Sequence, residues 1–317
     1  MENNVILEVQ NLKKYFTTPA GQLHAVDGVS FQIEAGKTLG IVGESGCGKS
    51  TTGRTILKLL EPTGGKIIFN GEDITGYNRK QMRKLRQDMQ MVFQDPFSSL
   101  DPRQTVSQLI SEPIIEHKLL KSKAEIEKRT LELMETVGLA ERYVNVYPHE
   151  LDGGRRQRIG IARALAMNPK LIVCDEPVSA LDVSIQAQIL NLLKQLQKDF
   201  GLTYIFITHD LSVVKYFSDD IAVMYLGQRV EKAPSDVLFK NPIHPYTKAL
   251  LSAIPLPIVG GEKPERQLIK GEITSPVNLP DECRFMKRCD CAQECCKNGN
   301  PQLREIEPNH FVACSCV

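Results

Sequence analysis

The sequence lacks a marked excess of charge of either sign. Its 39 Lys and Arg residues nearly balance 38 Asp and Glu residues, which leaves a formal net charge of +1. A chain with so little net charge has no overall electrostatic attraction to nucleic acid or to anionic lipid. We therefore expect no nucleic-acid partner.

The sequence also lacks a segment that could cross a membrane. The N-terminus, MENNVILEVQ, has neither the cationic start nor the apolar core of a signal peptide. No apolar run approaches the roughly 20 residues that a transmembrane helix needs. The longest candidate, residues 249–261, is interrupted by Pro255 and Pro257. We therefore expect a cytosolic protein whose membrane role depends on partners.

Cysteine is scarce in most of the chain and concentrated at its end. Cys47 and Cys174 are the only two of nine cysteines that precede residue 283. In a reducing cytosol, such a cluster favours metal ligands over disulfides. Hydrophobic residues make up 42% of the 317 residues, which is enough to bury a core and too many for a disordered chain.

The order of apolar and amphipathic segments predicts the fold class. Residues 5–75 are rich in predicted strands, and further buried strands are predicted over 171–174 and 204–208. Helices are predicted over 50–60, 79–87, 184–200 and most of 105–165, with a loop at 147–154. This alternation predicts an α/β fold with a parallel sheet covered on both faces. After Pro255 the composition turns to Pro, Gly and Cys, which marks a separate tail.

Residues 43–50, GESGCGKS, fit the phosphate-binding pattern G-x-x-x-x-G-K-S/T at every fixed position. Glycines let the backbone wrap a polyphosphate with its N–H groups, and the following helix points its positive end at the same anion. Lys49 can reach the β- and γ-phosphates, and the Ser50 hydroxyl can ligate Mg²⁺. Cys47 occupies a free position and is interpreted as a spacer. The expected nucleotide contacts here are Gly43, Ser45, Gly46, Cys47, Gly48, Lys49, Ser50 and Thr51.

A second site follows an apolar strand. Residues 171–174 are four apolar residues that run into Asp175 and Glu176. Asp175 is placed to hold Mg²⁺ through water, and Glu176 to polarise the attacking water. Together with the phosphate loop, this pair predicts ATP hydrolysis.

Between the two sites lies the segment LDGGRRQ, residues 151–157, followed by RQRIGIARAL. It resembles the signature Leu-Ser-Gly-Gly-Gln of the ABC family of ATPases, in which Asp152, Gly153 and Gly154 would meet the nucleotide. The resemblance extends over roughly residues 5–255.

The resemblance implies roles for residues that composition alone does not single out. Gln94 matches the Q-loop glutamine, which in the family senses Mg²⁺ and contacts the membrane subunits. Asp182, in the segment SALD, matches the D-loop, and His209 matches the switch histidine at the γ-phosphate. Tyr15 is similar in position to the aromatic residue that stacks on adenine.

The resemblance also implies the domain plan. A P-loop NTPase nucleotide-binding domain with a RecA-like core, an antiparallel β part and a helical subdomain is expected over residues 1–255. The helical subdomain is expected at about 95–165, and a cysteine-rich extension at 256–317.

Two segments resemble hallmarks of the oligopeptide/dipeptide importer branch, which also contains nickel and glycan importers. They are DPFSSLDPR, residues 95–103, and HPYTKALL, residues 244–251. The branch implies an ATPase at the cytoplasmic face of the cell membrane. Its partners are a second ATPase subunit, two transmembrane permease subunits and an extracytoplasmic solute-binding protein. A soluble nucleotide-switch ABC protein is the alternative.

The signature departs from the family pattern at two positions. Asp152 replaces the family serine and Arg155 the family glutamine. In this family each ATP lies between one chain's phosphate loop and the other chain's signature. At an effective dielectric of about 20, the Asp152 carboxylate in the signature repels the γ-phosphate by several kcal/mol, and the positive charge of Arg155 offsets part of this repulsion. Because Lys49, Asp175 and Glu176 are intact, we predict a heterodimer with a partner that carries an intact signature.

The tail predicts a metal centre. Its spacing is Cys283-x5-Cys289-x6-Cys296, with Cys314 following after seventeen intervening residues. Similar tails in the peptide-importer branch include some that carry a [4Fe–4S] cluster, and four thiolates also suit tetrahedral zinc. The remaining tail thiols, Cys291, Cys295 and Cys316, leave the ligand set open.

Overall fold

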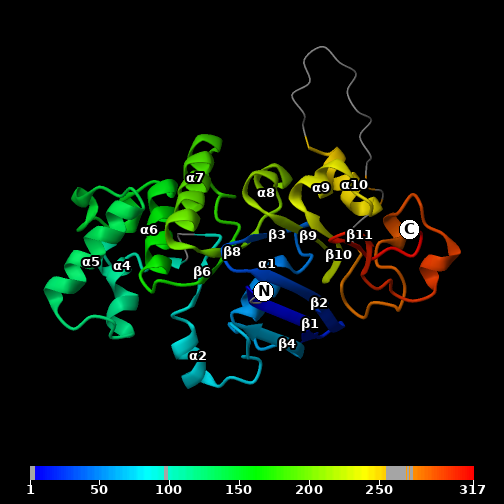
Figure 1. Cartoon of the computed structure of the whole chain (residues 1–317), viewed down its shortest axis with the longest axis horizontal. Helices are drawn as coiled ribbons and strands as arrows, with labels where there is room; N and C mark the ends of the chain where they lie inside the picture. The colour runs from blue at the N-terminus through cyan, green and yellow to red at the C-terminus, as the bar shows by residue number, and fades with distance from the viewer. Residues whose placement is uncertain (1–3, 96–98, 255–268, 270, 272–273) are drawn as a thin grey trace, which may run out of the picture. The chain divides into compact units, whose positions relative to one another are not determined.

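The computed structural model describes residues 4–95, 99–254, 269, 271 and 274–317. They fall into two compact units, whose helices and strands are labelled in Figure 1. The first unit combines the chain up to Gly76 with the chain from Phe206 onward, and the second spans Tyr77–Ile205. The expected boundary between cassette and tail, at 255/256, lies outside the described residues, as do residues 96–98 of the segment 95–103.

An antiparallel sheet opens the first unit. β1 (Val5–Thr18) and β2 (Gly21–Glu34) form a long hairpin. The other edge of β1 pairs with β4 (Gly64–Phe69), which pairs in turn with β5 (Glu72–Asp73). The apolar residues Leu7, Val9 and Leu12 of β1 are buried, as expected for a sheet with one face on the core. This sheet is the antiparallel β part that the family resemblance implied.

The second sheet of the first unit carries the phosphate loop. β3 (Thr38–Val42) is buried throughout and pairs in parallel with β9 (Asp220–Tyr225). Antiparallel strands extend it in the order β10 (Gln228–Pro234), β12 (His310–Val312) and β11 (Arg304–Glu307). The helices of this unit are α1 (Lys49–Ile56), α8 (Leu211–Phe217), α9 (Ser235–Lys240) and α10 (Pro245–Ser252). The tail therefore adds strands to the cassette's own sheet.

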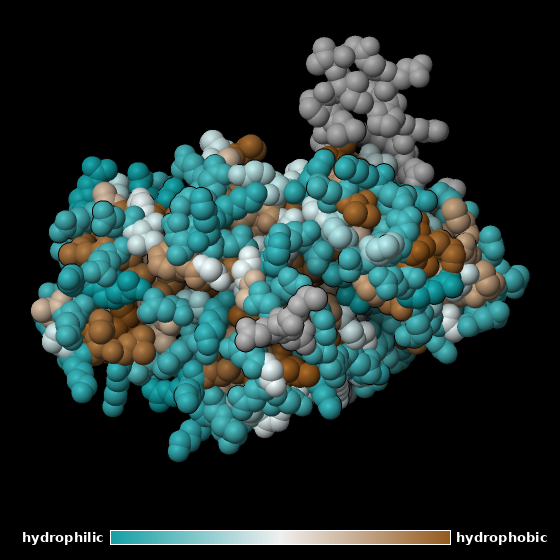
Figure 2. Space-filling model, viewed as in Figure 1, coloured by the Kyte–Doolittle hydropathy of each residue, from teal (hydrophilic) through white to brown (hydrophobic). Residues whose placement is uncertain are grey.

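The second unit is mainly helical. Its strands β6 (Met89–Val92) and β7 (Leu171–Asp175) pair in parallel. Its α-helices are α2 (Arg79–Leu85), α4 (Val106–Glu116), α5 (Lys123–Thr136), α6 (Gly153–Leu165) and α7 (Val183–Phe200). α4 packs on both α5 and α6. Figure 2 shows hydrophobic side chains reaching the surface over α4 and α5, where Ile115 is 55% exposed. The strand β8 (Thr203–Ile207) contains the division between the units.

Most predicted elements are confirmed within a few residues, and two differences have physical reasons. The helix predicted over 50–60 ends at Ile56, because Lys58 takes a left-handed backbone conformation (φ 50°) that a helix cannot continue. The parallel sheet is confirmed for β3–β9 and β6–β7, but its antiparallel extension by β10, β12 and β11 was not predicted. No helix among the described residues is long and apolar enough to span a bilayer.

Candidate functional site

The phosphate loop connects the buried strand β3 to α1, as the sequence predicted. Gly48 caps the helix in a left-handed conformation (φ 100°), where a Cβ atom would lie 2.0 Å from the carbonyl oxygen of Ala25. A Cβ at Gly43 would lie 2.2 Å from the carbonyl oxygen of Met224. Only glycine fits at these two positions, so the loop's close path past neighbouring backbone is fixed by the sequence.

Lys49 lies inside this loop. It is 5% exposed, and its Nζ donates hydrogen bonds to the carbonyl oxygens of Gly43 (2.8 Å) and Glu44 (2.9 Å). Ser50 and Thr51 follow in the first turn of α1, whose positive end faces the loop. Burial raises the pKa of the Cys47 thiol, which favours its neutral form and agrees with a spacer. The loop thus presents one cation and a helix terminus, which suits a polyphosphate.

Tyr15 lies in the same unit, at a cluster of polar side chains. Its ring stacks on His24, with ring centroids 4.3 Å apart, and its hydroxyl donates to Asp27. Burial opposes the ionisation of Asp27, but hydrogen bonds from Tyr15 and Arg284 lower the pKa of Asp27 overall. Tyr15 is therefore held by an ionised carboxylate and not by packing alone.

The two predicted carboxylates follow β7 in the second unit. Asp175 is fully buried at the end of the strand. Glu176 takes a left-handed backbone conformation (φ 46°), and its Oε2 accepts a hydrogen bond of 3.0 Å from Nε2 of Gln94. A non-glycine residue in this region stores strain that is common at functional sites. The structure therefore brings the predicted base and the predicted Q-loop glutamine into direct contact.

Asp152 is the N-cap of α6. Its Oδ1 accepts a hydrogen bond of 2.8 Å from the backbone N–H of Arg155, and its Oδ2 forms an ion pair with the Arg155 guanidinium. Gly153 and Gly154 form the first turn of the helix. Asp152 stands where the family signature has serine. Both residue types are good N-caps, so the start of α6 is preserved, but the side chain at this position is now negatively charged.

Asp182 and His209 are the two remaining residues that the family resemblance singled out. Asp182 caps α7 and accepts hydrogen bonds from the Ser184 hydroxyl (2.7 Å) and the Ile185 N–H (3.0 Å). These bonds lower the pKa of Asp182. His209 follows β8 and is exposed. The first unit thus holds Tyr15, the phosphate loop and His209, whereas the second holds Gln94, Asp152, Asp175, Glu176 and Asp182.

The tail cysteines gather in one region. Among the described residues, one group of metal-ligating side chains has all its donor atoms within 4.8 Å of one another: Cys295, Cys296 and Cys316. Sγ of Cys316 lies 3.4 Å from that of Cys295 and 3.5 Å from that of Cys296. With Zn–S bonds of about 2.3 Å, a tetrahedral zinc site separates its sulfurs by about 3.8 Å. This compact trio therefore has the spacing of a single-ion site.

The four predicted ligands are more widely spread but still interact. The N–H of Cys283 donates to the carbonyl oxygen of Cys296 at 2.9 Å. Burial raises the pKa of Cys283 to about 11, and the charges of Cys296, Cys314 and Cys289 add to the shift. Cys296 belongs to both sets. The residues present thus suit either metal group, with a different ligand set for each.

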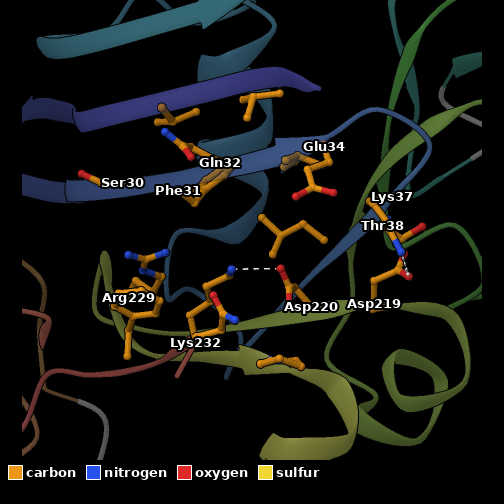
Figure 3. A pocket seen from close by; sticks show the side chains of 18 of the residues that line it. Ser30, Phe31, Gln32, Glu34, Lys37, Thr38, Asp219, Asp220, Arg229 and Lys232 are labelled. Carbon is orange, nitrogen blue, oxygen red and sulfur yellow. Dashed lines mark hydrogen bonds and ion pairs between the residues drawn. The ribbon is translucent and has the colours of Figure 1, made fainter. Parts of the chain in front are cut away.

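A cavity of about 990 Å³ lies in the first unit, away from these motifs. Figure 3 shows Arg229 and Lys232 of β10 in its wall, with an ion pair of 2.9 Å between Lys232 and Asp220. Burial lowers the pKa of Arg229 to about 10. None of the predicted nucleotide or metal residues is among the described residues that line it, so we do not assign the nucleotide to this cavity.

The sequence did not point to two tail arginines that reach the nucleotide elements. Arg288 forms an ion pair with Glu44 of the phosphate loop, and Arg284 with Asp27. Each pair joins residues more than 240 positions apart, so no local spacing could reveal it. Their only signal was their position in the cysteine-rich segment, next to Cys283 and Cys289.

A buried strand leading into a phosphate loop, with an Asp–Glu pair after another strand, defines a P-loop nucleotide hydrolase. The signature-like segment at the start of α6 places it in the class of ATP-binding cassette proteins. Residues 26–179 match the ABC transporter family, and residues 230–296 match the oligopeptide/dipeptide transporter C-terminal region. A dimeric cassette, MJ0796, solved with ADP and Pi, superposes with a TM-score of 0.67 at 32% identity over 73% of this chain and 99% of that chain.

Relatives that match nearly the whole chain identify the family within this class. The oligopeptide transport ATP-binding protein AppF of Bacillus subtilis is 52% identical over 98% of this chain and 96% of its own length. OppF of the same organism is 53% identical over the same shares. A putative peptide import ATP-binding protein of Brucella ovis is 49% identical over 99% and 98%. The chain belongs to the family of oligopeptide transport ATP-binding proteins.

Proposed function

We propose that this chain binds and hydrolyses ATP to power the import of oligopeptides or dipeptides through a membrane transporter. The observation that carries the proposal is the hydrogen bond between Gln94 and Glu176, because it joins the predicted base to the residue expected to report on the permease. The relatives named above are oligopeptide or peptide transport proteins, which supports peptides over nickel or glycans as the solute.

The chemistry follows from the groups that each unit supplies. Lys49 and the loop N–H groups bind the β- and γ-phosphates, in place of the carbonyl oxygens that Lys49 now contacts. Glu176 polarises the attacking water as general base, and His209 contacts the γ-phosphate. Tyr15 stacks on adenine.

Mg²⁺ fits the oxygen donors that the sequence singled out. Ser50, Gln94 and Asp175 would hold it, since hydroxyl, amide and carboxylate oxygens are its preferred ligands. When bound, Mg²⁺ neutralises charge on the phosphates.

The ATPase works as a pair of cassettes, and we propose that the second cassette is a different chain. Its intact signature would complete the site built on Lys49, Asp175 and Glu176. Asp152 would face the γ-phosphate of the partner's own site, where its charge slows turnover. The ion pair with Arg155 reduces this charge but leaves no hydroxyl donor.

The permease subunits would dock on the second unit. A groove of about 450 Å³ there is lined by the apolar residues Phe93, Leu100, Pro113 and Met167, among others. Phe93 is 42% exposed and adjoins Gln94. A permease helix seated in this groove would press on the residue that contacts Glu176, and would hold the chain at the cytoplasmic face of the membrane.

The tail cysteines would hold a metal centre. The spread set, Cys283, Cys289, Cys296 and Cys314, suits a [4Fe–4S] cluster in which each thiolate binds its own iron. The compact set, Cys295, Cys296 and Cys316 with one further ligand, suits zinc instead.

The test of the proposed function is reconstitution of the chain with its permease and partner subunits in vesicles. Peptide uptake should require ATP and should fail when Lys49→Ala removes the phosphate-binding cation. ATP-independent uptake, or ATP hydrolysis that does not respond to the solute-binding protein with peptide, would contradict the proposal.

A further inference from the structure

Arg288 of the tail forms a bidentate ion pair with Glu44 of the phosphate loop. Its guanidinium donates to both carboxylate oxygens of Glu44, at 2.7 and 2.9 Å, and to the Tyr225 hydroxyl at 3.3 Å. The Arg288 side chain is 7% exposed and that of Glu44 22%. A bidentate guanidinium–carboxylate pair with so little solvent access is a strong and directional contact. Glu44 is the second residue of the phosphate-binding pattern, at a position that the pattern leaves free.

The backbone of Glu44 continues this contact to the phosphate-binding lysine. The N–H of Glu44 donates to the Tyr246 hydroxyl at 2.8 Å, and its carbonyl oxygen accepts from Nζ of Lys49 at 2.9 Å. One residue therefore joins the tail arginine, helix α10 and Lys49. Without the ion pair to Arg288, the Glu44 side chain would no longer hold the backbone segment that must wrap the phosphates.

The tail segment that supplies Arg288 is itself packed into the cassette. The Phe285 ring is 4% exposed and lies against Tyr225 and Tyr246, with ring centroids 5.2 and 5.4 Å away. Because Phe285 is packed between two aromatic rings, the backbone around it is already ordered, and little further conformational freedom is lost when Arg288 binds Glu44. The backbone that carries Arg288 is thus fixed by packing.

A second arginine of the same segment reaches the tyrosine expected at the adenine. Arg284 pairs with Asp27, which also accepts from the Tyr15 hydroxyl. Arg284 donates in addition to the carbonyl oxygen of Leu226 and is 8% exposed. Asp27 is the common partner through which Arg284 fixes the orientation of Tyr15.

We propose that the cysteine-rich tail is a positioning element of the nucleotide site, in which Arg288 orders the phosphate loop through Glu44 and Arg284 orders Tyr15 through Asp27. The inference rests on the proposed roles of Lys49 and Tyr15 in binding ATP. Neither arginine touches the reacting atoms. Pre-ordering both contacts raises affinity because less conformational freedom is lost on binding.

The experiment measures the Kd of the complete protein for ATP and for inorganic tripolyphosphate, together with kcat and KM in the assembled transporter. Arg288→Ala should weaken both ligands roughly tenfold, because one charge-assisted contact that orders the loop is lost. Arg284→Ala should weaken ATP by a similar factor and leave tripolyphosphate unchanged. In both variants kcat at saturating ATP should stay within about twofold, since Lys49 and Glu176 are untouched.

A tail cation outside this network serves as the matched control. Lys297 forms an exposed ion pair with Glu294 on the surface of the tail, and Lys297→Ala should change neither Kd. Glu44→Gln keeps the shape of its side chain and removes the charge that Arg288 binds. It should weaken both ligands as Arg288→Ala does, and the two changes together should cost no more than either alone.

Unchanged ATP affinity in Arg288→Ala and Glu44→Gln would overturn the inference. Should Arg288→Ala fail to fold, Glu44→Gln decides alone, because it alters the loop side of the pair. Failure of the proposed function looks different: the unaltered protein would then not bind ATP, or Lys49→Ala would not weaken binding.

Discussion

The side-chain amide of Gln94 donates a hydrogen bond of 3.0 Å to the carboxylate of Glu176. The two residues lie 82 positions apart, just after the ends of the paired strands β6 and β7. Gln94 adjoins the exposed Phe93, so a partner that displaces this segment also changes the surroundings of the base. This contact offers a physical route by which the permease could control hydrolysis.

Gln94→Glu tests that contact by placing a second carboxylate against Glu176. The amide donor that holds Glu176 is lost, and like-charge repulsion displaces the Glu176 carboxylate from its position in the unaltered protein. We expect ATP turnover to fall about tenfold or more across the pH profile, because a misplaced base loses most of its effect. The measurement is a pH profile of ATP turnover.

The matched control is Gln195→Glu, because Gln195 also donates to a carboxylate, that of Asp199 at 2.8 Å, on the exposed face of α7. This variant should retain the unaltered profile. Identical profiles for Gln94→Glu and the unaltered protein would show that the Gln94–Glu176 contact has no part in turnover.

The charge of Asp152 predicts two unequal ATP sites. When this chain carries Glu176→Gln in the assembled complex, its own ATP site is inactive. The residual turnover then comes from the partner's ATP site, which Asp152 faces. Adding Asp152→Ser restores a hydroxyl donor and keeps an N-cap for α6, so this residual turnover should rise about a hundredfold. Turnover that does not rise would contradict the assigned role of Asp152.

The same asymmetry predicts different effects from the two catalytic bases. Glu176→Gln in this chain should nearly abolish turnover of the complex, whereas the equivalent change in the partner subunit should do much less. Equal losses, or full activity from a homodimer of this chain, would defeat the heterodimer proposal.

The two cysteine sets predict different metals. With a [4Fe–4S] cluster, protein purified without oxygen is brown and contains about four irons per chain, and Cys283→Ser loses them while Cys295→Ser keeps them. With zinc, the protein is colourless with one zinc per chain, and Cys295→Ser loses it. Elemental analysis of both variants distinguishes these cases, and protein without metal would refute both.

Buried His244 predicts acid sensitivity of the fold. Burial lowers the pKa of His244 to about 4, and its Nδ1 accepts from the N–H of Tyr246, which requires a neutral ring at that atom. The unfolded chain binds this proton below about pH 6.5, so stability is lost as pH falls from about 6.5 to about 4. The loss amounts to about 3 kcal/mol, since each pKa unit corresponds to about 1.4 kcal/mol. His244→Asn keeps an N-cap acceptor, and its melting temperature should fall less between pH 7 and pH 5 than that of the unaltered protein.

The sequence predicted most of what local chemistry determines. The phosphate loop, the apolar strand before Asp175 and the helix after Asp182 follow from glycine, burial and capping, which act over a few residues. It did not predict that β12 would extend the cassette's sheet, because strand pairing across 75 or more positions leaves no local pattern. The contacts of Arg284 and Arg288 were missed for the same reason.

The measurement that tests the account most directly is ATP binding and turnover of Glu176→Gln in the assembled transporter. Loss of a positioned base should slow hydrolysis by at least about a hundredfold, while ATP binding is retained because Lys49 and the loop are intact. Glu132→Gln, a change at an exposed carboxylate of α5, should leave both unaltered. Near-normal steady-state turnover in Glu176→Gln would remove Glu176 from the catalytic role and contradict the account.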